Sequence, residues 1–211
     1  LTATDPSGNS STAQAVVTVV DNIAPVAAAK NITVELDGSG EATIVAEDVD
    51  DGSSDNCGVS LSVSPDAFSC QDTASPVSVT LTATDPSGNS STAQAMVTVV
   101  DSIAPEAVAK DITVELDATG QAGIVAGDVD DGSSDNCGVV LSVSPDTFTC
   151  DELLGGEEKA GGFVTVTLTA TDPSGNSSTA QAVLTVVDNV APEAVAKDIT
   201  VELDGSGQAT I

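Results

Sequence analysis

Two acidic segments, EDVDDGSSDNCG and GDVDDGSSDNCG, begin at Glu47 and Gly127 and each ends beside a cysteine. The whole chain has 33 Asp and Glu residues against four Lys and Arg residues, so lysine cannot neutralise these carboxylates. Carboxylates that converge without a cation repel one another, and about six to eight hard oxygen ligands are what calcium takes. The segments therefore predict calcium sites. The alternative is a set of solvated turns, because Asp, Asn, Ser and Gly favour turns whatever they bind.

The four cysteines form two pairs by spacing. Cys57 and Cys70 are thirteen residues apart, and Cys137 and Cys150 repeat that interval. One pair in each copy predicts disulfides within a domain and an oxidising, extracellular location. A zinc site would need four soft ligands, whereas each copy offers two thiols and no His. A redox-active pair is disfavoured because the chain has no CxxC motif and no basic neighbour to lower a thiol pKa.

The composition argues against several classes of function. A formal net charge of −29 repels nucleic acids and anionic membranes, and no apolar run is long enough for membrane insertion. Paired carboxylates can hydrolyse glycosides, but the chain has no Trp or Tyr to hold a sugar, so we expect no enzyme. A calcium-dependent carbohydrate-binding module is the alternative function. An ice-binding face at Thr80, Thr82 and Thr84 is disfavoured because solvent-facing Thr is ordinary in strands.

A long internal repeat organises the chain. LTATDPSGNSSTAQA begins at Leu1, Leu81 and Leu168, and the second interval is longer by seven residues. A unit of this length fits one small sandwich domain. The positions of the repeated segment predict complete repeats over 23–102 and 103–189, with an insertion near 151–162. Residues 1–22 are then the end of a preceding repeat, and residues 190–211 the start of a following one.

Each repeat predicts an immunoglobulin-like β-sandwich. In VSVTLTAT (77–84) apolar and polar residues alternate, as in a half-buried strand. We expect strands over 26–36, 41–46, 59–64, 77–84 and 91–100, with two short pieces around Cys70. The fold class is therefore all-β, with tandem sandwiches of about seven strands joined by short Pro-containing linkers into an extended rod.

Strand directions predict where the acidic segments meet. The loop 47–56, the turn 85–89 and the linker at Asp21 should share the N-terminal pole of a repeat, with the turn equivalent to Asp37 in the preceding repeat approaching from the other side. The candidate calcium ligands at the first junction are Asp21, Asp48, Asp50, Asp51, Asp55, Asp85 and Asn89. At the second junction they are Asp101, Asp128, Asp130, Asp131, Asp135, Asp172 and Asn176.

TLTATDPSGNSSTAQAVVTVVDNIAP resembles the end of hyalin-type immunoglobulin-like repeats. The following NITVELDGSGEATIVAEDVDDGSSDNCGVSLSVSPDAFSC resembles repeats of giant cell-surface adhesins of the Bacteroidota, including those of gliding cells. The resemblance covers the whole chain and implies export, surface fibres, and roles in cell adhesion or gliding motility. It also implies O-glycosylation at Asp-Ser/Thr followed by an apolar residue, for which Thr73 and Ser102 are candidates.

These patterns together predict a structural segment of an extracellular adhesin stalk, stiffened by calcium at domain junctions and by one disulfide in each repeat. The expected partners are neighbouring repeats of the same chain. Lateral self-association of the rods into a filament is a second structural possibility, which the negative charge opposes unless cations bridge it.

Overall fold

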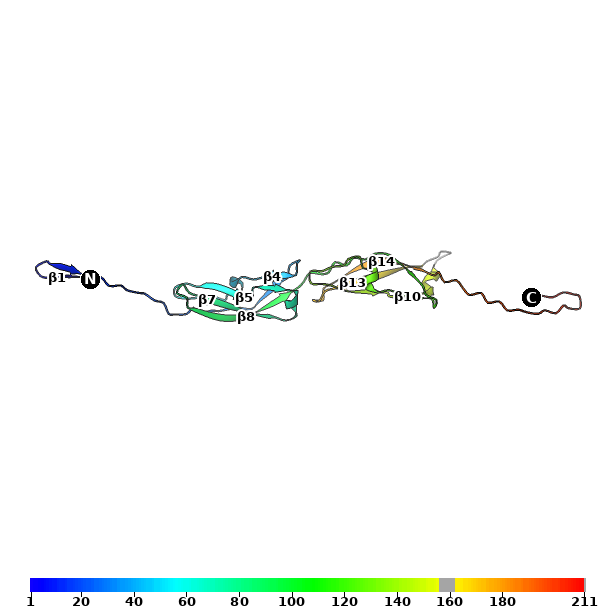
Figure 1. Cartoon of the computed structure of the whole chain (residues 1–211), viewed down its shortest axis with the longest axis horizontal. Helices are drawn as coiled ribbons and strands as arrows, with labels where there is room; N and C mark the ends of the chain where they lie inside the picture. Colours follow the sequence, from blue (N-terminus) through cyan, green and yellow to red (C-terminus); the bar gives the residue numbers. More distant parts are fainter. Residues whose placement is uncertain (156–161, 211) are drawn as a thin grey trace. The chain divides into compact units, whose positions relative to one another are not determined.

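The structure is a computed structural model that describes residues 1–155 and 162–210 (Figure 1). The chain divides into two compact units. Unit 1 comprises Leu1–Pro105, Ser134–Val139 and Thr171–Asn176, and unit 2 comprises Glu106–Ser133, Val140–Ala170 and Ser177–Ile211. The predicted all-β class is confirmed, since sheets form the body of both units. In the described part of the chain, no helix is long and apolar enough to cross a membrane.

Apart from the hairpin of residues 2–12, unit 1 contains one four-stranded and one two-stranded sheet, and several of its strands are labelled in Figure 1. The larger sheet has the order β3 (Ile32–Glu35), β8 (Ser90–Val100), β7 (Val77–Thr84), β5 (Ser60–Ser64). The smaller sheet pairs β4 (Glu41–Thr43) with β6 (Ala67–Ser69). Strand β3 runs parallel to β8, and the other pairs are antiparallel.

The core of unit 1 follows from the alternation along its strands. Val79, Leu81 and Ala83 of β7 are fully buried, whereas the intervening polar residues lie on the other face. Val97 and Val99 of β8 join the same core, as does Phe68 from β6. The strand predicted over 77–84 therefore has the observed bounds of β7, and the strand predicted over 91–100 starts one residue after the observed start of β8.

The second copy of the repeat has the same strand order. Its larger sheet is β11 (Val140–Ser144), β13 (Gly162–Thr171), β14 (Ser177–Val187), β9 (Ile112–Glu115). Its smaller sheet pairs β10 (Gln121–Gly123) with β12 (Thr147–Thr149). Phe148 is 1% exposed and packs with the valines and leucines of these strands.

The two terminal stretches bury little surface. Residues 2–12 form a hairpin of β1 (Thr2–Thr4) and β2 (Ser10–Thr12) around the same DPSGNS turn that joins β7 to β8. Residues 188–210 are exposed and contain no strand in the described structure. The repeat boundaries inferred from the sequence remain a prediction.

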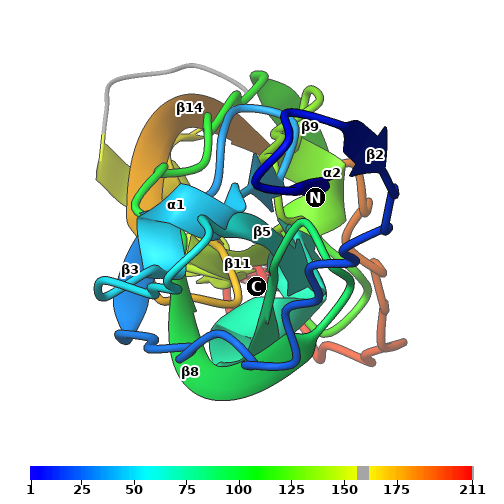
Figure 2. The ribbon, with the colours of Figure 1, turned by 90° about the vertical axis from the view of Figure 1, so that its left-hand side faces the viewer.

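Each acidic segment begins with a helical turn rather than a loop. These turns are α1 (Ala46–Val49) and α2 (Ala126–Val129), and Figure 2 shows α1 beside β5. The Asp48 carboxylate accepts the Val45 backbone N–H at 2.8 Å, and Asp128 repeats this bond with Val125. Val49 and Val129 are fully buried, so each turn is held to the core by its one valine.

A serine in each acidic segment holds the chain that precedes the first strand of the repeat. The Ser133 hydroxyl oxygen accepts the Val108 backbone N–H at 2.9 Å, and the same hydroxyl donates to the Val108 carbonyl at 3.3 Å. Ser53 makes the same two bonds with Ala28.

We expect Ser133→Ala to lower the free energy of unfolding by about 1–2 kcal/mol, because it leaves a part-buried N–H without an acceptor. Urea unfolding followed by circular dichroism measures the change. Ser174→Ala, an exposed position in the hairpin turn, is the control and should change stability little. Equal losses in both variants would contradict the assigned role of Ser133.

Candidate metal and disulfide sites

The disulfide joins Cys70 to Cys137, with 5.4 Å between the Cα atoms, and both residues belong to unit 1. Cys57 and Cys150 are free thiols. The predicted pairings Cys57–Cys70 and Cys137–Cys150 are therefore wrong. The bond joins one sequence repeat to the next instead of closing a loop within one.

Strand geometry explains why the predicted pairs cannot form. Cys57 precedes β5 and Cys70 follows β6, and the strand pairings give β5 and β6 the same direction, so the two cysteines lie at opposite ends of these strands. An extended chain rises about 3.3 Å per residue, whereas a disulfide needs Cα atoms within about 7 Å. Cys70 instead lies against Gly40 in the turn before β4, where it meets Cys137.

Gly40 leaves room for this disulfide. It has φ +76°, and a Cβ atom there would lie 2.6 Å from Cys70 Sγ and 2.8 Å from the Asn136 carbonyl oxygen. Both the backbone conformation and the close approach therefore require glycine. The Asn136 side-chain amide also donates to the Asp37 carbonyl at 3.1 Å, so the turn and the disulfide are held together by polar contacts as well.

Three carboxylates that are distant in sequence meet in unit 1. Asp101 follows β8, Asp135 lies beyond α2, and Asp172 begins the turn after β13. One oxygen from each lies within 4.8 Å of the others. Asp101 is 8% exposed and Asp172 is 5% exposed, so these charges are largely withdrawn from water. We call this group the three-aspartate cluster.

Hydrogen bonds satisfy only part of the three-aspartate cluster. Asp101 Oδ1 accepts the Ile103 N–H at 3.2 Å and the Asn136 amide at 3.3 Å, and Asp135 Oδ2 accepts the Cys137 N–H at 2.8 Å. Asp172 accepts two bonds from Asn176, at 2.8 and 2.7 Å.

Two buried oxygens of the cluster and one of the neighbouring Asn136 remain without a donor. Asp101 Oδ2, Asp135 Oδ1 and Asn136 Oδ1 receive no hydrogen bond from any residue that the structure describes. Buried polar atoms are normally paired, and unpaired buried charges are costly. Oxygens from carboxylates and an amide are the ligand types that calcium prefers, so the donor set fits a calcium ion.

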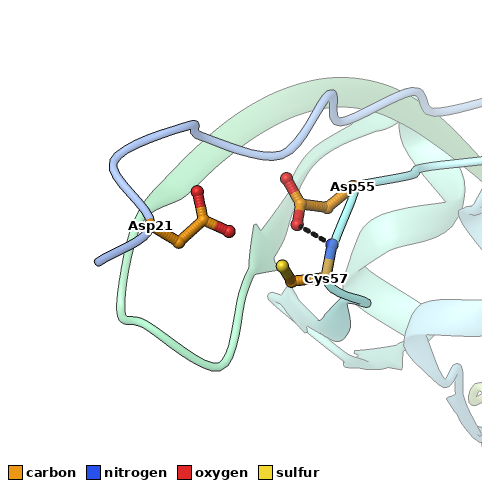
Figure 3. Close-up of side chains that lie close together, drawn as sticks. All are labelled: Asp21, Asp55 and Cys57. Carbon is orange, nitrogen blue, oxygen red and sulfur yellow. Dashed lines mark hydrogen bonds between the residues drawn. The ribbon is translucent and has the colours of Figure 1, made fainter. Parts of the chain in front are cut away.

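The first copy holds a related but less complete group. Figure 3 shows Asp21, Asp55 and Cys57 with their side chains directed toward one another. The Asn56 amide donates to Asp21 Oδ2 at 3.3 Å, and Asp55 Oδ2 accepts the Cys57 N–H at 2.8 Å. Asp55 Oδ1 is buried and unpaired within the described structure, as Asp135 Oδ1 is. Cys57, however, is a thiol here rather than half of a disulfide.

The thiol and the carboxylate of this group perturb each other. A hydrogen bond to Asp21 is the largest cause that raises the pKa of Cys57, followed by desolvation and by repulsion from nearby aspartates. The pKa of Asp21 is lowered, chiefly by the Ile23 backbone N–H and then by the Cys57 thiol. Cys57 is therefore held as a thiol at neutral pH.

We expect Asp21→Asn to lower the pKa of Cys57 and to speed its alkylation by iodoacetamide near pH 8, because the thiolate then loses a negative neighbour. Peptide mass spectrometry resolves the rate at Cys57 from the rate at Cys150. Asp51→Asn makes the same charge change in the acidic segment that contains Cys57 and serves as the control. An unchanged or slower rate in Asp21→Asn would contradict this account.

The other predicted ligands lie outside the two groups. Asp48 and Asp128 cap their helical turns, and the Asp50 and Asp130 carboxylates accept the backbone N–H of Ser53 and Ser133. Hydrogen bonds from Ser53 and Ser133 are also the largest cause that lowers the pKa of Asp50 and of Asp130. Asp51 and Asp131 are exposed. In the described structure, none of these six is part of a group that converges on a metal position.

The two hairpin turns are hydrogen-bonded to the linkers through their asparagines. Asp85 is 5% exposed and accepts two bonds from Asn89, as Asp172 does from Asn176. The Asn89 amide also donates to the Asp21 carbonyl at 3.1 Å, and the Asn176 amide donates to the Asp101 carbonyl at 3.0 Å. The two asparagines therefore tie the turn to the linker through their amide hydrogens.

Sequence reasoning missed Asn56 and Asn136. Each follows an aspartate of one of the two groups, in the motif DNCG, which occurs in both copies. That recurrence was the available signal for two uncharged residues whose amides donate to Asp21 and Asp101.

The two candidate glycosylation positions differ in their surroundings. The Thr73 hydroxyl donates to the Cys70 carbonyl at 3.0 Å within a short 3-10 helix, η1 (Cys70–Ala74), and is half-buried. Ser102 is exposed beside Asp101. Modification at either position remains a prediction.

No protein-family model matches the chain, and no curated protein matches it. Among solved structures it is similar to Sidekick-1 immunoglobulin domains 1–4, with TM-score 0.38, 14% identity, and coverage of 88% of this chain and 57% of that one. It is also similar to human mucin-like protocadherin EC1-2, with TM-score 0.41, 15% identity, and coverage of 78% and 98%. A third is Drosophila N-cadherin EC1-4, with TM-score 0.43, 15% identity, and coverage of 80% and 50%. The chain thus spans about half the length of the Sidekick-1 and N-cadherin structures. Likeness at these TM-scores supports no conclusion about function.

Proposed function

We propose that the chain is a structural segment of a long extracellular adhesin stalk, in which calcium binds where consecutive sequence repeats meet. The observation that carries the proposal is the three-aspartate cluster, with its buried and unpaired oxygens. The repeated sequence, the all-β fold and the resemblance to hyalin-type repeats of Bacteroidota surface proteins support the stalk role.

Without a cation, electrostatic repulsion between its carboxylates makes the three-aspartate cluster unfavourable. Asp101 and Asp172 are both more than nine-tenths buried, and their charges lie within 4.8 Å of the charge on Asp135. Like charges at such a distance repel by about 1–4 kcal/mol for effective dielectric constants between those of water and a protein surface. A divalent cation converts this repulsion into attraction.

Calcium fits the donors better than a transition metal does. Asp101 Oδ2, Asp135 Oδ1 and Asn136 Oδ1 offer hard oxygens, and Asp172 has further lone pairs on both of its oxygens. Soft metals prefer thiolate and imidazole, but the nearby Cys137 is committed to a disulfide and the chain has no His. Water would complete the coordination shell of a calcium ion.

The ion would bind segments that are far apart along the chain. Asp101 lies in the linker after β8, whereas Asp135 and Asp172 come from two loops of the next repeat. Calcium would therefore restrict the linker and stiffen a tandem array, and ligand recognition by the adhesin would belong to other domains. Calcium could also offset the charge that opposes lateral association into a filament.

The test is thermal unfolding and small-angle scattering of the oxidised chain in calcium, in magnesium, and in EDTA with sodium at matched ionic strength. We expect calcium to raise the melting temperature beyond the salt control and to increase the maximum dimension. The raised melting temperature reports binding to the folded state. Identical curves and profiles in calcium and in sodium would contradict the proposal.

A further inference from the structure

We propose that Cys57 and Cys150 are the two halves of further inter-repeat disulfides, so that every repeat of the array is covalently bonded to the repeat before it and to the repeat after it. The partner of each thiol is another copy of this repeat. The proposal rests on the Cys70–Cys137 bond and on the matching surroundings of the two free thiols, and it does not depend on calcium binding.

The surroundings of Cys150 match those of Cys70. Cys70 Sγ lies 3.7 Å from the Gly40 carbonyl oxygen, and Cys150 Sγ lies 3.7 Å from the Gly120 carbonyl oxygen. A Cβ atom on Gly40 would lie 2.6 Å from Cys70 Sγ, and one on Gly120 would lie 2.7 Å from Cys150 Sγ. Both cysteines also begin short 3-10 helices, η1 and η2 (Cys150–Gly155).

The turn beside Cys150 also matches the turn that receives Asn136. The Asp37 carbonyl, which accepts the Asn136 amide, closes a turn with the Gly40 N–H at 2.9 Å. The Asp117 carbonyl closes the equivalent turn with the Gly120 N–H at 2.9 Å. The site around Cys150 therefore has the same thiol, glycine and turn carbonyl as the Cys70 side of the Cys70–Cys137 disulfide, which we call the receiving half.

The surroundings of Cys57 match those of Cys137, the other cysteine of the disulfide. The Cys57 and Cys137 backbone N–H groups donate to Asp55 and Asp135, both at 2.8 Å. The preceding Asn56 and Asn136 amides donate to Asp21 and Asp101, both at 3.3 Å.

One difference between these sites points to a missing partner. Asn136 and Cys137 are half-buried, whereas Asn56 and Cys57 are exposed. Asn136 has the Asp37 carbonyl as an additional acceptor, and Cys137 has Cys70 as its bonded partner. A receiving half like that around Cys150 would supply both contacts to Asn56 and Cys57.

Bond formation needs an external disulfide oxidant, for which oxidised glutathione is suitable. The Cys150 thiolate attacks one glutathione sulfur and releases one reduced glutathione, and the incoming cysteine thiolate then attacks Cys150 Sγ and releases the second. The two thiol protons pass to the released glutathiones, and two electrons reduce the oxidant. One S–S bond is broken, and the new Cys–Cys S–S bond replaces it.

The test extends the full chain. Residues 190–211 resemble residues 23–44, so appending residues 45–102 after Ile211 completes one more repeat and adds a copy of Cys57 and a copy of Cys70. The original and extended chains are folded with oxidised and reduced glutathione, thiols are blocked by alkylation, and disulfides are assigned by mass spectrometry of non-reduced peptides.

We expect two free thiols in both chains, with Cys150 free in the original and bonded to the added copy of Cys57 in the extended chain. In the extended chain, Cys150→Ser should free the added Cys57, whereas Cys57→Ser should leave the new bond intact. Unchanged strand content by circular dichroism checks that the variants fold. A bond between Cys150 and Cys137, or a free Cys150 in the folded extended chain, would overturn the proposal.

Discussion

Replacing Cys70 and Cys137 together by serine is expected to lower the free energy of unfolding of unit 1 by about 4 kcal/mol. The bond closes a chain segment with a sequence separation of 67, and loop closure of that length restricts the unfolded chain by about this amount in the chain-entropy model. Chemical unfolding of the oxidised protein, followed by circular dichroism because the chain has no Trp or Tyr, measures the difference.

The matched control is the double variant Cys57→Ser with Cys150→Ser, which removes two thiols and no disulfide of this chain. It should unfold at the same denaturant concentration as the wild type. Comparable large losses in both double variants would show that the pairing within each repeat forms instead, because each variant would then remove one partner of both disulfides.

Asp101→Asn should destabilise the protein in calcium but not in EDTA. In EDTA the variant should be as stable as the wild type or more stable, because it removes repulsion from a largely buried group of like charges. In calcium the variant should be less stable, because it loses a charged ligand. With free calcium at about 100 times the wild-type dissociation constant, calcium stabilises the wild type by about 2.7 kcal/mol, and the variant should lose most of this gain.

Asp131→Asn is the control for Asp101→Asn. It makes the same change of charge at an exposed position of the acidic segment, outside the three-aspartate cluster. Its melting temperature should follow that of the wild type in both solutions. If Asp101→Asn were destabilised equally in EDTA and in calcium, the aspartate would have a structural role unrelated to calcium.

The elements that could be predicted from sequence are those in which the order of apolar and polar residues follows the burial of their side chains. Alternation over 77–84 gave the bounds of β7 because each side chain there faces either the core or the opposite surface. The segment 26–36 was predicted as one strand, but only Ile32–Glu35 joins a sheet ladder. Earlier residues make isolated bridges, Val26 with Ser54 and Ala29 with Asp50, to the acidic segment.

The disulfide could not be predicted from cysteine spacing, because spacing carries no information about strand direction. Cys57 and Cys70 are close in sequence, yet β5 and β6 separate them, whereas Cys70 and Cys137 are distant in sequence and bonded. For the metal site, the prediction that linker, loop and turn converge does correspond to Asp101, Asp135 and Asp172. It did not distinguish them from Asp128 and Asp130, whose carboxylates hydrogen-bond to their own segment.

Calcium titration by isothermal calorimetry, in the wild type and in Asp101→Asn, tests the central claim most directly. The account predicts saturable binding in the oxidised wild type, loss of at least one binding event in Asp101→Asn, and wild-type binding in Asp131→Asn. Equal calcium binding by the wild type and by Asp101→Asn, or no binding by the wild type, would show that the three-aspartate cluster is not a calcium site.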